Sequence, residues 1–175
     1  MLLDGKPIRT PKLAVLELPT RSAASLVATE WAIQETYVNA DLMPLTSLAT
    51  TCTDLTAHQI PDKLDEVIGY LRTDTICFLD AKHKVAAEQE RSYASIWDWF
   101  ERTYGYRLSV ASGDIMCVPE HPPELIPAVK ARLANVDQWT LTALGIAAGN
   151  CRSSALTYVF SNLYRGERPQ AERSC

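Results

Sequence analysis

Apolar residues change their spacing at Pro19, and this change divides the chain into a short extended segment and a long helical one. Before Pro19, the apolar pair at 2–3 is followed by Asp4 and Gly5, a pair typical of tight hairpin turns. We therefore predict extended structure over residues 1–19, with a hairpin between 2–3 and 6–10 and a further short strand at 14–18.

The helical pattern begins after Thr20, which we expect to be a helix N-cap. Helical spacing places the following residues on one face of this first helix: Ala23, Leu26, Val27, Glu30, Trp31 and Gln34. The same spacing predicts helices at 43–56, 62–72, 86–104, 124–135, 138–149 and 153–164, with Pro44 tolerated in the first turn of the 43–56 helix. Between these helices we expect short strands at 75–79 and 107–111 and a loop at 113–123.

The aromatic residues of the 86–104 helix indicate where part of the core lies. Trp97 is on the apolar stripe and is expected to be buried, whereas Trp99 is offset from the stripe and is expected to be partly exposed. Gly105 should end the helix. Gly145 and Gly149, four residues apart, indicate close helix packing or a helix end. The stripe consists of Tyr93, Ile96, Trp97, Phe100 and Tyr104.

These elements predict an α+β fold for the 175 residues. A small N-terminal sheet-plus-helix domain is expected at 1–80, followed by an all-helical domain at 81–164 and a disordered tail at 165–175. A chain of this length buries enough surface to form a core without disulfides. We therefore expect reduced thiols at the five cysteines, Cys52, Cys77, Cys117, Cys151 and Cys175.

Charge and hydropathy argue against several classes of partner. The formal net charge is −4, and the acidic residues are concentrated in residues 1–80. No basic surface for nucleic acid or anionic lipid is therefore expected, and the acidic half hints at a basic partner. No apolar run reaches the roughly 18 residues of a membrane-spanning helix, so we expect no membrane insertion, and the N-terminus shows no targeting pattern.

Residues that usually carry catalysis are few and scattered. His58, His83 and His121 are far apart in the sequence and are interpreted as solvent-exposed imidazoles rather than metal ligands. No glycine-rich phosphate loop and no serine-nucleophile motif occurs. Ser153 and Ser154 are interpreted as the start of a helix. The sequence therefore predicts a protein that is not an enzyme and that needs no cofactor or metal.

Two interpretations stay open at this point. In one, the chain is a small hydrolase or transferase, in which the 113–123 loop covers a pocket that contains Cys117 and His121. In the other, the mixed aromatic and polar face around Trp31 belongs to a binding protein, either at a partner interface or at a junction between domains.

Several blocks of sequence, taken in order, resemble the ATP synthase assembly chaperones that hold the alpha subunit. The resemblance covers about residues 1–158. The blocks are Leu3-Asp4-Gly5-Lys6-Pro7, Thr10-Pro11, Leu18-Pro19, Ala28-Thr29-Glu30-Trp31 with Gln34, Met43-Pro44-Leu45-Thr46 with Leu48, Asp74-Thr75-Ile76-Cys77-Phe78, Trp97, Tyr104-Gly105 and the segment from Trp139 to Leu141.

The resemblance implies both a fold and a function. Such proteins have a small N-terminal α+β domain and a C-terminal helical domain, and they act as chaperones in the mitochondrial matrix. They bind the newly imported alpha subunit and shield the apolar surface that the beta subunit later covers, which prevents aggregation. We expect a monomer that hydrolyses no nucleotide. The residues expected to contact the partner or to shape the site are Glu30, Trp31, Gln34, Met43, Pro44 and Leu45.

The resemblance also predicts that the chain is truncated at both ends, because the family begins further upstream and continues for several more helices. A non-functional truncated isoform is therefore a further alternative.

Overall fold

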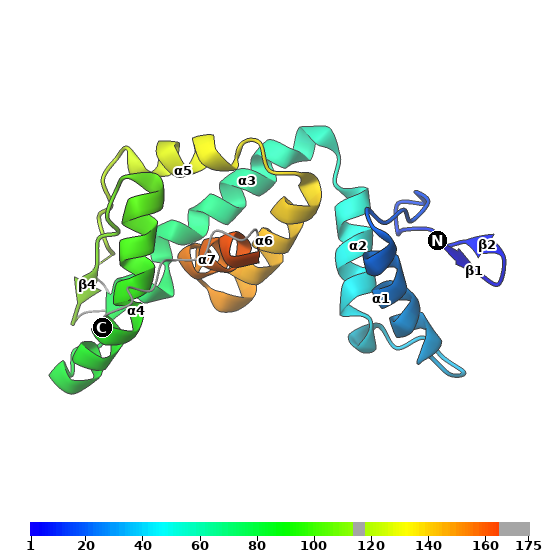
Figure 1. The fold of residues 1–175 in the computed structure, drawn as a ribbon, viewed down its shortest axis with the longest axis horizontal. Helices are drawn as coiled ribbons and strands as arrows, with labels where there is room; N and C mark the ends of the chain where they lie inside the picture. The colour runs from blue at the N-terminus through cyan, green and yellow to red at the C-terminus, as the bar shows by residue number, and fades with distance from the viewer. Residues whose placement is uncertain (114–117, 165–175) are drawn as a thin grey trace, which may run out of the picture. The chain divides into compact units, whose positions relative to one another are not determined.

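The computed structural model describes residues 1–113 and 118–164, and for residues 160–164 it describes the backbone only. Its contacts divide the chain into two compact units, Met1–Ile60 and a second that begins at Pro61. Helices predominate and the sheets of the described residues are two-stranded, so the α+β class is confirmed (Figure 1). The domain boundary after residue 80 stays a prediction, and the expected tail at 165–175 lies outside the described residues.

The N-terminal hairpin forms as predicted. Strand β1 (Leu2–Leu3) pairs with β2 (Lys6–Pro7) in antiparallel fashion. Asp4 and Gly5 between them have left-handed backbones, with φ of 49° and 76°. Two successive left-handed residues are the geometry of a type I′ turn, whose twist matches that of the flanking strands.

The strand predicted at 14–18 is reduced to a single bridge, between Arg9 and Val15. A turn intervenes here, because Leu13 has a left-handed backbone and its N–H donates to the Thr10 carbonyl at 2.9 Å. The segment still supplies the core, since Leu16 is fully buried.

Two helices, α1 and α2, lie side by side in the first unit (Figure 1). Thr20 caps α1 as predicted, because its hydroxyl accepts the N–H of Ala23 at 3.1 Å. Pro44 stands in the first turn of α2, also as predicted. The helical elements of this unit are α1 (Arg21–Ala32), η1 (Ala40–Leu42), α2 (Pro44–Asp54) and η2 (Ala57–Gln59).

The buried stripe of α1 is narrower than its sequence pattern indicates. Val27 and Glu30 are buried. Leu26, which the spacing groups with them, is 57% exposed. With 3.6 residues per turn, Leu26 lies at one edge of the stripe and the half-buried Trp31 at the other.

The second unit is mainly helical. Helix α7 packs against α6 and α4. The elements are α3 (Ile60–Gly69), η3 (Tyr70–Thr73), η4 (Thr75–Cys77), β3 (Phe78–Leu79), α4 (His83–Tyr104), β4 (Ala111–Ser112), α5 (Leu125–Leu133), α6 (Gln138–Cys151) and α7 (Ser154–Tyr164).

The two strands predicted in this unit are shorter than expected. Of residues 75–79 only Phe78 and Leu79 are extended, because the Asp74 carboxylate accepts the Ile76 N–H at 3.2 Å and turns η4 into a 3-10 helix. Of residues 107–111 only Ala111 belongs to β4, which pairs with β3 in parallel.

Aromatic residues of α4 form part of the core of the second unit. Trp97, Phe100 and Tyr104 are buried, as their spacing predicts. Trp99 is buried as well, which corrects the expectation of partial exposure. Its ring meets those of Phe100 and Tyr104 edge to face, with centroids 6.4 and 6.2 Å away. Gly105 ends the helix in a left-handed conformation, as predicted.

A buried carboxylate holds the start of α7. Asp74 is fully buried and accepts the N–H of Ala155 at 2.9 Å. Burial raises the pKa of the Asp74 carboxyl, and hydrogen bonds, led by that from Ala155, partly offset this rise. Ser154 begins the helix, as predicted, and its hydroxyl donates to the Val67 carbonyl at 2.5 Å.

The two glycines of α6 mark close packing, as predicted. A Cβ added to Gly145 would lie 2.7 Å from Cε of Lys63 on α3, and one added to Gly149 would lie 3.4 Å from the Tyr70 hydroxyl. A side chain at Gly145 would therefore have to displace the end of the Lys63 side chain, so the glycine leaves room for that lysine beside α6.

Candidate partner-binding site

The predicted site residues come together where α1 ends and α2 begins (Figure 1). This junction lies wholly within the first unit. The residues brought together are Glu30, Trp31 and Gln34 from the α1 side and Met43, Pro44 and Leu45 from the α2 side.

Glu30 supplies the N-terminal cap of α2. Its carboxylate accepts the backbone N–H groups of Leu45 and Thr46, each at 2.7 Å, and the Thr46 hydroxyl at 2.7 Å. Met43, which occupies the cap position, offers no side-chain hydrogen bond. Because the first N–H groups of a helix lack intrahelical partners and carry a partial positive charge, a buried carboxylate stabilises them strongly. Glu30 therefore fixes α2 against α1.

Gln34 orders the segment that connects the two helices. Its Nε2 donates to the Glu30 carbonyl at 3.0 Å, and its Oε1 accepts the Asn39 N–H at 2.7 Å. The Asn39 side chain in turn accepts the Asp41 N–H at 3.1 Å, which starts η1. The connection is thus held by side-chain hydrogen bonds at several points.

The other four predicted residues differ in their exposure. Met43 is buried, and Trp31 is half-buried, with an indole Nε1 that is buried and has no hydrogen-bond partner among the described residues. Pro44 and Leu45 reach the surface. Glu30, Gln34 and Met43 therefore hold the junction together, and we call these three residues its framework. That any of the six contacts a partner stays a prediction.

Apart from Leu45, the sequence predictions missed a set of exposed apolar side chains at this junction, which we call the loop surface. Five large apolar side chains between residues 33 and 45 are substantially exposed. One signal was present, because Tyr37 and Val38 lie in a connection where polar turn residues are usual, although no periodicity there shows which side chains are covered. The loop surface consists of Ile33 (56% exposed), Tyr37 (87%), Val38 (61%), Leu42 (52%) and Leu45 (38%).

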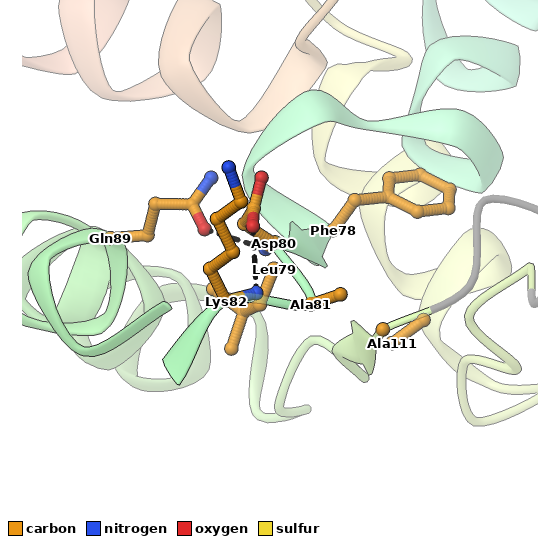
Figure 2. Close-up of a pocket in the computed structure, with 8 residues that line it drawn as sticks. Phe78, Leu79, Asp80, Ala81, Lys82, Gln89 and Ala111 are labelled. Atoms are coloured by element: carbon orange, nitrogen blue, oxygen red, sulfur yellow. Dashed lines mark hydrogen bonds between the residues drawn. The ribbon is translucent and has the colours of Figure 1, made fainter. Parts of the chain in front are cut away.

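The second unit contains a hollow of about 490 Å³ beside the strand pair, which Figure 2 shows. Asp80 and Gln89 shape its wall, because the Asp80 N–H donates to Gln89 Oε1 at 2.8 Å and the Asp80 carboxylate accepts the Lys82 N–H at 2.7 Å. Gly113, where the predicted 113–123 loop begins, also lines it. Its polar groups thus hold the start of α4 in place.

The hydrolase interpretation gains nothing from this arrangement. Cys117 lies outside the described residues, and His121 does not line the hollow. His121 is half-buried, which corrects the expectation of an exposed imidazole. Its Nδ1 accepts the Ser109 N–H at 3.1 Å and its Nε2 donates to the Leu71 carbonyl at 2.9 Å. Both ring nitrogens are therefore engaged with the backbone.

Across 1–113 and 118–164, no three His, Cys, Asp or Glu side chains gather as metal ligands would. Within the same ranges, no helix combines the length and the apolarity needed to cross a bilayer.

Comparison with known proteins agrees with the fold and the sequence blocks. The model of the ATP12 chaperone protein family matches residues 1–101. The crystal structure of Atp12 from Paracoccus denitrificans is 25% identical with a TM-score of 0.82, and the match covers 95% of this chain and 70% of that one. A chaperone candidate from Agrobacterium tumefaciens is 27% identical with a TM-score of 0.82, with 95% of this chain and 61% of that chain covered.

The matched region contains the whole first unit, including the junction of α1 and α2. It also contains the resembling blocks from Leu3 to Trp97. The family match covers more than half of the chain, and the structural matches extend the likeness over nearly all of it. The chain therefore belongs to the ATP12 chaperone family, the family of ATP synthase assembly chaperones that its sequence resembles.

Proposed function

We propose that this protein binds the unassembled alpha subunit of ATP synthase and prevents its aggregation until the beta subunit covers the same apolar surface. Membership of the ATP12 chaperone family carries the proposal. The exposed apolar side chains of the first unit support it physically, because a chaperone must offer apolar surface to the apolar surface that it shields. Release by exchange with the beta subunit requires no catalysis, so the protein acts as a binding protein and not as an enzyme.

The proposal extends to place and oligomeric state. By its resemblance, the protein works in the mitochondrial matrix, where imported alpha subunits await assembly. It works as a monomer, because self-association through the apolar surface would cover the surface that must bind its client. Fractionation of mitochondria from cells that make the protein tests the location, and light scattering coupled to size-exclusion chromatography tests the mass.

Co-expression with the alpha subunit tests the central claim. We expect more alpha subunit in the soluble fraction and co-purification of the two chains. The beta subunit, co-expressed in the same way, is the control for unspecific binding of apolar surface. Insoluble alpha subunit alongside a folded chaperone chain would refute the proposal, and equal retention of both subunits would refute its specificity.

A further inference from the structure

The apolar side chains of the loop surface are exposed to solvent, although hydrogen bonds of the framework fix the connection that carries them. Tyr37 is 87% exposed and Val38 61% exposed, yet the chain on either side of them is fixed. Gln34 binds the Asn39 N–H, and Glu30 binds the start of α2. A fixed connection loses little conformational entropy when it binds a partner, so exposed aromatic and aliphatic groups on it can serve as preorganised anchors.

The charged side chains of the stretch that carries this surface are acidic. No Lys or Arg occurs between Arg21 and Lys63, a stretch that contains both helices and their connection. Within the connection itself, Glu35 and Asp41 are exposed. The carboxylate of Glu30 in the same stretch is buried in the α2 cap, so it contributes to the framework and not to the rim.

On these grounds, and resting on the proposed function, we infer that the loop surface is the part of this chain that contacts the alpha subunit, at a patch that is apolar in its centre and bordered by Lys or Arg. Tyr37 and Val38 insert among the apolar side chains of the partner. Glu35 and Asp41 face the basic border and steer the encounter. A second copy of this chain fits poorly, because a two-fold contact through this surface would bring the same carboxylates face to face.

Paired substitutions test the apolar part of the inference. The double variant Tyr37→Ser with Val38→Ser removes the two most exposed anchors, and Leu2→Ser removes a 66% exposed leucine from β1 of the same unit as a matched control. The readout is the chaperone concentration that halves light scattering when denatured alpha subunit is diluted into buffer. Loss of two central anchors should raise that concentration roughly thirtyfold, while Leu2→Ser leaves it unchanged. Unchanged melting temperatures of both variants would show that the fold is intact.

A charge reversal tests the basic border. Glu35→Lys should weaken protection about threefold at low salt and have no effect in roughly 0.5 M salt, because exposed charges are screened there. Glu17→Lys makes the same charge change at another exposed position of the first unit and should have no effect.

The outcomes separate the two proposals. If the unmodified chain does not protect the alpha subunit, the proposed function fails and the surface assignment fails with it. If the unmodified chain protects and the double variant protects equally well, only the surface assignment is overturned. Equal losses in the double variant and in Leu2→Ser would also overturn it, as would dimers that dissociate when Tyr37 and Val38 are replaced.

Discussion

The substitution Glu30→Gln should make the junction of α1 and α2 easier to unfold, although it replaces only one side-chain oxygen by an NH₂ group. The carboxylate accepts three hydrogen bonds at 2.7 Å from the first turn of α2, and the residue is 8% exposed. A glutamine keeps one acceptor oxygen, but its NH₂ group would face the remaining donors of Thr46. At least one buried donor then loses its partner, which costs about 1–3 kcal/mol, and loss of the charge at the helix N-terminus costs about 1 kcal/mol more.

We therefore expect the free energy of unfolding of the first unit to fall by about 2–4 kcal/mol. Urea denaturation of the full chain measures it, with hydrogen exchange of the α1 and α2 amides to assign the loss to this unit. Glu35→Gln is the control, since Glu35 is exposed and its substitution should change stability by less than about 0.5 kcal/mol. A Glu30→Gln protein as stable as the control would show that the carboxylate does not act as the cap of α2.

Three further predictions concern the second unit. Asp137→Ala should remove the N-cap of α6 and cost about 1 kcal/mol at pH 7. A hydrogen bond from the Thr140 side chain lowers the pKa of Asp137, so this stabilisation is fully present above about pH 4 and is lost as the pH falls through the lowered pKa; denaturation at a series of pH values should show a difference that shrinks below about pH 4. Burial raises the pKa of Asp74, so the stability of the unmodified chain relative to Asp74→Asn should fall as the pH rises from about 4 through the raised pKa, and a flat difference between pH 4 and 7 would contradict this. Burial raises the pKa of Cys77 to about 12, so iodoacetamide at pH 8 should modify the exposed Cys151 well before Cys77, as peptide mass spectrometry of the folded chain would reveal.

Much of the local structure could be predicted because its causes lie within a few residues. The hairpin turn depends on Asp4 and Gly5, the start of α1 on the Thr20 hydroxyl, and the end of α4 on Gly105. The predicted strands were too long because β-propensity competes with turns that side-chain hydrogen bonds stabilise. Asp74 bends residues that β-propensity alone favours as a strand.

The residues of the candidate site were proposed from the sequence, but their structural roles were not. Its six residues belong to blocks that resemble the family, and the structure brings them to one junction. Their spacing does not show that Glu30 caps a helix that begins 14 residues later, nor that Gln34 orders the connection. The loop surface escaped prediction because exposure depends on which neighbours cover a side chain, and the connection has no periodicity from which to infer them.

The sequence by itself determined the main helices, the Thr20 cap, the Gly105 helix end, the hairpin and the membership of a chaperone family, since each depends on short-range backbone preferences or on matched residues in order. Only the tertiary structure decided which apolar residues are covered. Trp99 is buried although it is offset from the apolar stripe of its helix, Leu26 is left exposed, and His121 is hydrogen-bonded to the carbonyl of Leu71, 50 residues away. Burial and long-range hydrogen bonds arise when elements pack together, and no local pattern records which elements those will be.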